Sequence, residues 1–496
     1  MPIAVKRSNV KFLPDPSRVI VRFLYIDAAR SANIVHAVLG MSESEVTEVL
    51  GHVLRNFSLR HRNISKIFEK HYNRISTLFP QLGIDPESLG FSRKLLIGSY
   101  FTLEYAIESA AFFNPSIIEH PDQTGLRIGE KRVIISFRAT GEGHISSIEF
   151  RTGVLDISSN LTLEPTGKMM EEAEYIRRHL YDKKSFKSKL DEMQDFHTLI
   201  PHDLIMDKLP DKFTYGELRD TIATARTTLH LAADKDLLFN QIMWLASSHY
   251  ELEFSYDTHI SERVIFPVSS AESNGIEDAR FVKFIEDDGT DMYYATYTAY
   301  SGISILPKML STRDFYHFKV WPLHGEIAQN KGMALFPRKI RGNYAMLCRL
   351  DGFNNYIAFS EKINIWREAR LLQKPRYPWE FVQIGNCGSP IETDEGWLVI
   401  THGVGPMREY VLGASLFDLE NPEKEIGRLN KPLLAPNTEE REGYVPNVVY
   451  SCGSMIHNND LILPYAMSDY GSTYATLDFR ELLNALKNSQ MSATIT

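Results

Sequence analysis

A recurring hairpin pattern constrains the fold of this chain more than any other feature of its sequence. In five places an apolar strand is followed by a turn-rich tip and a second strand that ends in polar groups. Turn residues stand at the tips, as in the segments DDG, RGN, DEG and NND. The five predicted hairpins occupy residues 114–140, 276–300, 331–349, 388–403 and 453–469.

The spacing of the hairpins predicts how they assemble. The second strands of the last three end near residues 349, 402 and 468, about 50 to 65 residues apart. This spacing fits propeller blades better than a sandwich, whose strands come every ~8–12 residues. We therefore expect a mainly β fold, a five-bladed β-propeller with N-terminal and inserted helical blocks.

Two helical blocks flank and interrupt the β pattern. Residues 42–80 have apolar side chains at helical spacing behind a candidate N-cap at Ser42 or Ser44. Residues 94–113 are strongly apolar but include glutamates, so a buried globular helix is favoured over a membrane span. A second block covers roughly residues 168–250, and its charge runs are interpreted as solvated helix faces.

The apolar stripes of both blocks need a partner surface, so the blocks are expected to form a homo-oligomer or to cover the acceptor side of a site. The chain length of 496 residues also favours several units over one core. The predicted units are an N-terminal segment with its helical block (1–113), a first blade region (114–164), an inserted helical block (165–255), and the remaining blades with a C-terminal helix (256–496).

Bulk composition excludes some functions. A formal net charge of -9 argues against a nucleic-acid binder that relies on overall positive charge. The three cysteines form no CxxC pair, which indicates a reducing compartment and no structural zinc. The N-terminal segment lacks the apolar core of a signal peptide, so we expect a cytoplasmic protein without a membrane partner.

Polar and ionisable residues occupy the same structural position in every hairpin. The first residue of one strand lies beside the last residue of the next, so these ends should gather around the propeller axis. The paired ends are Asn114 and Ser116 with Arg138, Asp278 with Tyr300, Lys331 with Arg349, Gly388 with His402, and Gly453 with Asp469.

Three of these residues suit an anion. Lys331, Arg349 and His402 come from consecutive hairpins, and phosphate matches the fork of an arginine. In the alternative interpretation, Lys331 pairs with an acid and Arg349 braces a loop. Because the residues occur at matched positions, we favour the anion site.

The acid beside this cluster decides the type of reaction. Glu277 and Asp278 are adjacent at a strand start, so only one of them is expected to face the axis. Inverting hydrolysis needs an acid and a base, whereas phosphorolysis needs only the acid because phosphate is already an ionised nucleophile. One acid with a basic cluster favours phosphorolysis. Asp469 could serve as a base or hold sugar hydroxyls, and we interpret it as a sugar ligand.

Several stretches together resemble one known family. They are IEDARF, NKGMALFPRKIRGNYAMLCR, IETDEGWLVITHGVG, REYVLGASLFDLENPEKEIGRLNKPLLAP and VPNVVYSCGSM, with a fainter match in RVIISFRATGEGHISSIEFRTG. The chain is similar in these to glycoside hydrolase family 130, the β-mannoside phosphorylases and related β-mannosidases. Departures occur at GNCGSP and NKG, and the helical blocks make the chain longer than many members.

The resemblance implies roles for individual residues. Asp278 matches the catalytic acid, which in the family is thought to protonate the glycosidic oxygen through a hydroxyl of the bound mannose. The implied phosphate ligands are Lys331, Arg349, His402 and Tyr410. The implied sugar contacts are Arg138, Asp469, Asn114 and Ser116.

These observations predict an inverting glycoside phosphorylase that cleaves a β-1,2- or β-1,4-linked mannoside with inorganic phosphate to give α-mannose 1-phosphate. Phosphate is a co-substrate, and no metal or organic cofactor is implied. One alternative is a β-mannosidase that uses water on the same scaffold. The other is a non-catalytic glycan-binding propeller, which would have no need of an acid beside a phosphate site.

Overall fold

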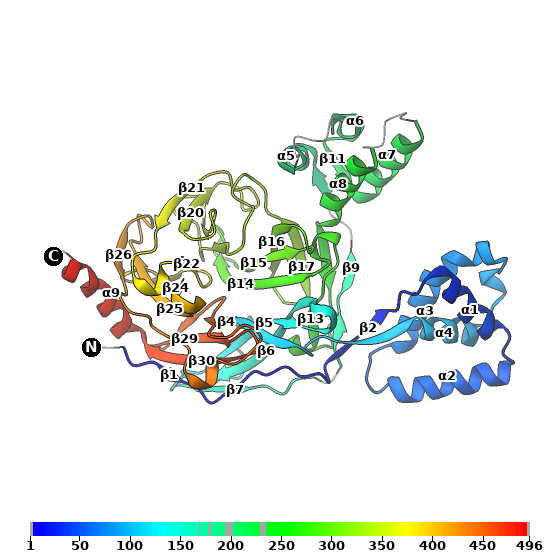
Figure 1. The fold of residues 1–496 in the computed structure, drawn as a ribbon, viewed down its shortest axis with the longest axis horizontal. Coiled ribbons are helices and arrows are strands. Elements are labelled where there is room, and N and C mark those ends of the chain that lie inside the picture. The colour runs from blue at the N-terminus through cyan, green and yellow to red at the C-terminus, as the bar shows by residue number, and fades with distance from the viewer. Residues whose placement is uncertain (1–2, 168, 177–179, 194–201, 229–234, 494–496) are drawn as a thin grey trace.

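The computed structural model describes residues 3–167, 169–176, 180–193, 202–228 and 235–493. Within them, each of the five predicted hairpins is present as an antiparallel strand pair, and the fold is mainly β (Figure 1). All four of the turn segments DDG, RGN, DEG and NND contain a residue with positive φ, namely Gly289, Gly342, Gly396 and Asn458. The turn chemistry read from the sequence is therefore confirmed at these tips.

The strands form five groups along the chain, each built around one hairpin. The first contains β4 (Ala111–Glu119), β5 (Lys131–Thr140), β6 (Ser146–Leu155), β7 (Leu161–Leu163) and β13 (Arg263–Ile265). The second contains β14 (Gly275–Ile285), β15 (Asp291–Tyr300), β16 (Ile305–Thr312), β17 (His317–Pro322) and β12 (Tyr250–Glu253). The third contains β18 (Ala334–Leu335), β19 (Tyr344–Cys348), β20 (Asn355–Ser360) and β21 (Ala369–Gln373).

The remaining two groups complete the β region. The fourth contains β22 (Gln383–Asn386), β23 (Ile391–Thr393), β24 (Gly396–Val404), β25 (Tyr410–Phe417) and β26 (Glu425–Arg428). The fifth contains β27 (Val449–Tyr450), β28 (Met455–His457), β29 (Asp460–Met467), β30 (Gly471–Asp478) and β1 (Lys6–Arg7). The pairing of β1 with β30 brings the N-terminal segment into the last group.

Each group contacts the next, and the fifth contacts the first. The joining contacts are the pairing of Gly275 with Ser146, the Thr296 hydroxyl donating to Met333 O, Ile384 N donating to Phe353 O (2.9 Å), Tyr410 N donating to Asn447 O (3.0 Å), and Cys452 N donating to Pro115 O (2.8 Å). The five groups are therefore linked by contacts in chain order, and the last is also linked to the first.

The N-terminal helical block lies apart from the strand groups (Figure 1). It contains α1 (Ala28–Leu39), α2 (Glu43–Phe57), α3 (Ile64–Ile75) and α4 (Phe91–Tyr100), with β2 (Val19–Phe23) and β3 (Thr102–Ala106) leading to and from it. Ser42 caps α2 in a capping box with Glu45, which selects it over Ser44. The helix expected over 94–113 is wrong beyond Tyr100, because β3 pairs with β2 and an apolar run does not by itself distinguish helix from strand.

The inserted block is also less helical than its sequence suggested. It contains β8 (Glu171–Glu172), β9 (Glu174–Ile176), β10 (Leu180–Asp182), α5 (Lys183–Met193), α6 (Asp203–Met206), β11 (Lys212–Thr214), α7 (Tyr215–Thr228) and α8 (Lys235–Ser247). The expected helical start near residue 168 is wrong for its described residues, because β8 and β9 pair with β13 and β12. Sheet pairing overrides the local helix propensity of the charged residues there.

The C-terminal helix α9 (Phe479–Ala493) closes the described chain, as predicted. Its residues Phe479, Leu482 and Leu486 are buried in a core shared with the fourth and fifth strand groups. Among the residues that the structure describes, no helix combines the length and apolar character needed to cross a membrane.

Candidate functional site

Two neighbouring hairpins carry the same irregularity where their first strands begin. A bulge follows Phe113 in β4 and Glu277 in β14. Asn114 and Asp278 occupy these bulges with φ of 50° and 56°, a left-handed conformation that Asn and Asp tolerate better than most residues. Asn114 Nδ2 donates to Asp278 Oδ1 at 2.6 Å. The two bulges therefore turn these side chains toward each other.

The adjacent acids Glu277 and Asp278 both contact Arg138. Arg138 Nη2 donates to Glu277 Oε1 at 2.9 Å, and its Nη1 lies 3.6 Å from Asp278 Oδ1. Glu277 also forms an ion pair with Lys331. The bulge interrupts the alternation that was expected to direct the two side chains to opposite faces, so both acids reach Arg138. Glu277 is held by two cations, which leaves Asp278 as the less constrained acid.

The surroundings of Asp278 favour its ionised form. Burial raises the pKa of this carboxyl, but the charge of Arg138 and the hydrogen bond from Asn114 outweigh burial, and the net pKa lies below its usual value. Lys331 contributes in the same direction. In the absence of a ligand Asp278 is therefore a carboxylate at neutral pH.

Asp469 has the opposite character. The sequence predicted that it ends the second strand of its hairpin, but β29 ends at Met467 and Asp469 lies in the turn to β30, with φ of 54°. Burial, followed by the negative charge of Asp278, raises the pKa of Asp469 to about 6. Two carboxyl groups with separated pKa values thus lie near one another, an arrangement typical of acid–base sites.

Replacing Asp469 by asparagine should stabilise the protein at neutral pH. The pKa of Asp469 is raised in the folded state, so its stability contribution is complete below the unfolded pKa and is lost as the pH rises through about 6. Asp469→Asn should raise the free energy of unfolding at pH 7.5 by up to about 3 kcal/mol, and by little at pH 4. Urea unfolding at both pH values measures this. A variant that is equally destabilised at both would contradict it.

A second cluster surrounds His402 on β24. Burial, reinforced by the positive charges of Arg349 and Arg280, lowers the pKa of His402 well below its usual value, so its imidazole is neutral. The Tyr410 ring lies nearly parallel to the imidazole, with centroids 6.1 Å apart. The neutral imidazole therefore lies beside two permanent positive charges, those of Arg349 and Arg280.

Gln383 is a member of this cluster that the sequence did not indicate. Its side chain lies 2.8 Å from His402 Nε2. With the amide oxygen toward His402 and Arg349 it accepts from Arg349, and its nitrogen donates to Gly352 O at 3.2 Å. Gln383 lies at the start of β22, outside the hairpin ends at which the site residues were predicted. Only its position at the start of β22, opposite the His402 strand, could have indicated it.

Two further residues connect the clusters. Arg280 Nη1 donates to Asn386 O at 3.1 Å, and the same carbonyl lies 3.2 Å from His402 Nδ1. Arg280 Nη2 donates to the Tyr450 hydroxyl at 2.6 Å. The Asn386 carbonyl is therefore shared between the strand of the acids and the strand of the histidine.

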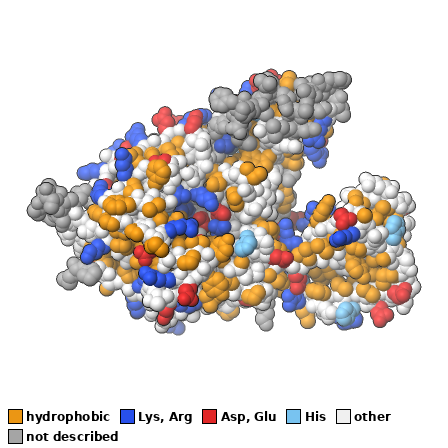
Figure 2. Space-filling model, viewed as in Figure 1, with side chains coloured by type: hydrophobic (Ala, Val, Ile, Leu, Met, Phe, Trp, Pro, Cys, Tyr) orange, Lys and Arg blue, Asp and Glu red, His pale blue; other side chains and the backbone are white. Residues whose placement is uncertain are grey.

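The structure places the predicted site residues in two separate clusters. Lys331 joins the acid cluster through Glu277, whereas Arg349, His402 and Tyr410 form the basic cluster. Ser116 is fully buried, and its hydroxyl accepts from Phe281 N at 3.2 Å. Figure 2 shows basic and acidic side chains gathered near the middle of the strand groups.

The position of His402 depends on a glycine. His402 pairs with Gly385, not with Gly388 as predicted. A Cβ at Gly385 would lie 2.6 Å from the ring carbon Cε1 of His402. Gly385→Ala should displace the imidazole, lower stability by roughly 1–3 kcal/mol and weaken anion binding.

Gly90→Ala provides the control for this change, because a Cβ there meets no atom within 4 Å. Calorimetry of phosphate binding and melting temperatures for both variants test the expectation. If Gly385→Ala binds phosphate as tightly as Gly90→Ala, the proposed dependence is wrong.

The sequence matches a protein-family model described as beta-1,4-mannooligosaccharide phosphorylase over residues 181–488. It is 35% identical over 224 residues to a 1,2-beta-oligomannan phosphorylase of Thermoanaerobacter sp., covering 44% of this chain and 74% of that protein. It is 29% identical over 233 residues to a beta-1,2-mannobiose phosphorylase of Listeria innocua, covering 45% of this chain and 63% of that protein.

A solved structure of beta-1,2-mannobiose phosphorylase from Listeria innocua in complex with beta-1,2-mannobiose aligns with 76% of this chain and 92% of its own chain. The identity in that alignment is 21% and the TM-score is 0.45.

Proposed function

The chain belongs to glycoside hydrolase family 130, and from this premise we propose that it is an inverting β-mannoside phosphorylase that forms α-mannose 1-phosphate. The observation that carries the proposal is the juxtaposition of two clusters, one holding the acid Asp278 and the other the cation Arg349. They are joined through the Asn386 carbonyl.

The reaction needs an acid and an anion on opposite sides of one sugar carbon. A phosphate oxygen forms a bond to C1 of the mannoside while the bond from C1 to the leaving oxygen breaks, which inverts the configuration. The leaving oxygen takes a proton that originates on Asp278. Because phosphate is itself the nucleophile, no second carboxylate is required to activate water.

Phosphate binding would prepare Asp278 for this role. The carboxyl is ionised in the free protein because Arg138, Asn114 and Lys331 favour its charged form. A bound anion adds negative charge nearby and offsets these cations, which raises the pKa of Asp278. The order of events would then be anion binding, proton uptake and glycosidic cleavage.

The remaining residues receive roles from their contacts. We assign phosphate to Arg349, His402, Lys331 and Tyr410, with Gln383 orienting the first two. We assign the sugar to Asn114, Arg138 and Asp469, while the buried Ser116 hydroxyl accepts from Phe281 N and positions the strand beside Asp278. Asn114 Oδ1 and Arg138 Nε are buried without a hydrogen-bond partner among the described residues, which is consistent with polar groups that bind a ligand.

We also propose that the five strand groups are the blades of a β-propeller. Two observations support this arrangement, namely the contacts that link each group to the next and the contact of the fifth with the first. The pairing of β1 with β30 would then join the two ends of the chain within one blade.

The helical blocks are proposed to mediate self-association or to border the acceptor side. Leu59, Tyr25 and Phe91 in or beside the N-terminal block are exposed apolar side chains. Light scattering should report a mass above that of one 56.7 kDa chain. A monomer at micromolar concentration would exclude the oligomer.

A β-mannosidase on the same scaffold is the main alternative. It is favoured by the ion pair between Lys331 and Glu277, which reduces the positive charge available for phosphate. A glycan-binding propeller without activity is the other alternative. It gives no reason for paired carboxyl groups with separated pKa values.

Incubation with β-1,2- and β-1,4-mannobiose, with and without inorganic phosphate, distinguishes a phosphorylase, a β-mannosidase and a glycan-binding propeller. The phosphorylase requires phosphate for cleavage of one of the two disaccharides. Release of free mannose at the same rate without phosphate would support the hydrolase, and binding without cleavage would support the glycan-binding propeller.

A further inference from the structure

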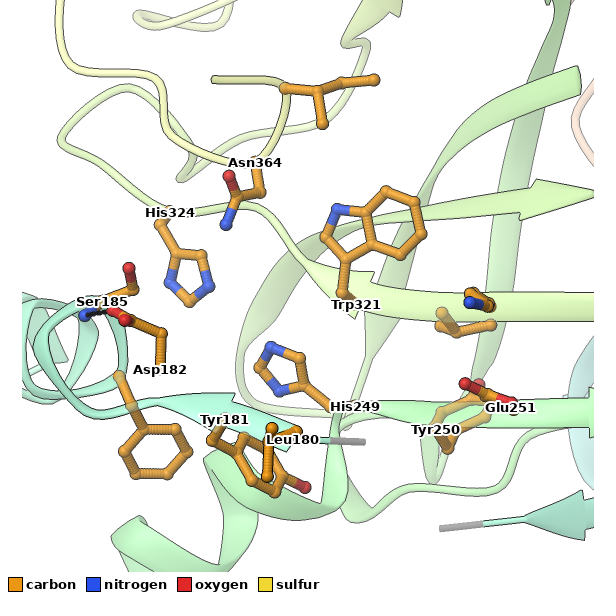
Figure 3. Close-up of a pocket in the computed structure, with 14 residues that line it drawn as sticks. Leu180, Tyr181, Asp182, Ser185, His249, Tyr250, Glu251, Trp321, His324 and Asn364 are labelled. Atoms are coloured by element: carbon orange, nitrogen blue, oxygen red, sulfur yellow. Dashed lines mark hydrogen bonds between the residues drawn. The ribbon is translucent and has the colours of Figure 1, made fainter. Parts of the chain in front are cut away.

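A cavity of about 370 Å³ lies between the inserted block and the second strand group, away from the clusters described above (Figure 3). One wall comes from β10 and α5, and includes Asp182 and Ser185. The other comes from β17 and the segments that follow β17 and β20, and includes Trp321, His324 and Asn364. This volume falls within the range of about 300–1,000 Å³ in which proteins bind small molecules.

Hydrogen bonds fix the segments that carry the polar groups of the cavity. His324 N donates to Asn364 O at 2.9 Å, and Trp366 N donates to His324 O at 2.7 Å. On the opposite wall the Tyr181 hydroxyl donates to Ala246 O at 2.6 Å. Figure 3 shows Trp321, His324, His249 and Asn364 directed toward the same space. The walls are therefore built before any ligand arrives.

Two donor or acceptor atoms of this wall are unsatisfied. Trp321 Nε1 and His324 Nδ1 are buried and have no hydrogen-bond partner among the described residues. His324 is 4% exposed, and burial lowers its pKa to about 3, so its imidazole is neutral. Buried polar atoms without partners call for a bound water or ligand.

The lining selects the chemistry of the ligand. Asp182 and Glu251 supply two negative charges on the lining. Lys319 on the lining and Lys189, whose charge acts on His324, supply two positive ones, so the charges favour neither an anion nor a cation. Carboxylates accept hydrogen bonds, the indole N–H donates, and neutral imidazole can do either. Trp321 also offers an aromatic surface. A neutral molecule with many hydroxyl groups and apolar C–H faces satisfies all of these groups.

We propose that this cavity is a second, non-catalytic site for a neutral saccharide, whose identity as a β-mannoside rests on the proposed function. It is separate from the acid cluster because β17 is three strands from β14 in the same sheet, roughly 14 Å at the usual strand spacing. A site in this cavity would hold one part of a mannoside chain on the protein while an end of that chain reacts at the acid cluster. It would also give the inserted block a function.

Isothermal titration with β-1,2-mannotriose in the absence of phosphate tests the proposal on the full-length protein. The wild type should show two binding events. Trp321→Phe keeps an aromatic ring and removes the N–H donor, and Asn364→Ala removes the amide. Each should weaken one event about threefold to tenfold, as expected for one neutral hydrogen bond. Phosphorolysis of mannobiose should stay within twofold of the wild type.

Asn73→Ala, which alters an exposed asparagine on α3, is the matched control and should preserve both events. A single binding event in a wild-type protein that performs phosphorolysis would overturn this inference and leave the proposed function intact. Two events that neither variant alters would also overturn it. If the wild type is inactive but retains the binding event that Asn364→Ala weakens, the proposed function is contradicted and the saccharide site in the cavity is supported.

Discussion

Asp278→Asn is expected to reduce phosphorolysis of a β-mannobiose by about 10²–10⁴-fold, the usual contribution of general acid catalysis. The change removes the ionisable proton and keeps the shape of the side chain. It also keeps an acceptor oxygen for Asn114 Nδ2, which now lies 2.6 Å from Asp278 Oδ1. Glu277 keeps its hydrogen bond with Arg138, so melting temperature should fall only modestly, through loss of the charge that Arg138 and Lys331 favour. The main loss should appear in kcat.

Two control variants make the result specific. Asp288→Asn alters an exposed acid at the tip of the same hairpin, where its carboxylate accepts from Thr290, and activity should be unchanged. Glu277→Gln weakens the bridge between Arg138 and Lys331, so it should disturb binding more than kcat. Near-normal turnover in Asp278→Asn together with loss in Glu277→Gln would reverse the assignment of the acid.

Arg349→Ala is expected to raise the KM for phosphate by roughly 10- to 150-fold, because a charge-assisted hydrogen bond contributes about 1.5–3 kcal/mol. The KM for the mannoside should move far less, since Arg349 contacts the side chain of Gln383 in the basic cluster and not the acid cluster. Lys331→Ala should act in the same direction but more weakly, because Glu277 already holds its ammonium group.

Arg341→Ala is the control for Arg349→Ala, because Arg341 is an exposed arginine at the tip of the same hairpin. Steady-state kinetics in both substrates and melting temperatures should be measured together. If Arg349→Ala is destabilised while its KM for phosphate is unaltered, Arg349 braces a loop and does not bind the anion.

The β part of this fold could be predicted because its signals are local. Alternating strands and turn residues lie within each hairpin, so the five pairs appear where the sequence indicated them. The helix expected over 94–113 failed at Thr102, where pairing with Phe23 replaces a helical turn. That pairing joins residues far apart in the chain, which no local pattern reveals.

The candidate site was also predictable only where its signals are local. Hairpin ends indicated that Asn114, Arg138 and Asp278 would lie close together, and these residues are in contact. The bulge that directs both Glu277 and Asp278 to Arg138 was not predictable, because it depends on the register of β14 against β15. Gln383 was not predictable either, because only strand pairing brings it to His402.

The most direct test of the proposed reaction is a ³¹P NMR time course of the wild-type protein with a β-mannobiose and inorganic phosphate. We expect the phosphate signal to decline and an α-mannose 1-phosphate signal to grow in equal amount, with one acceptor sugar released for each phosphate consumed. Cleavage of the disaccharide with an unchanged phosphate signal would contradict phosphorolysis and identify the protein as a hydrolase.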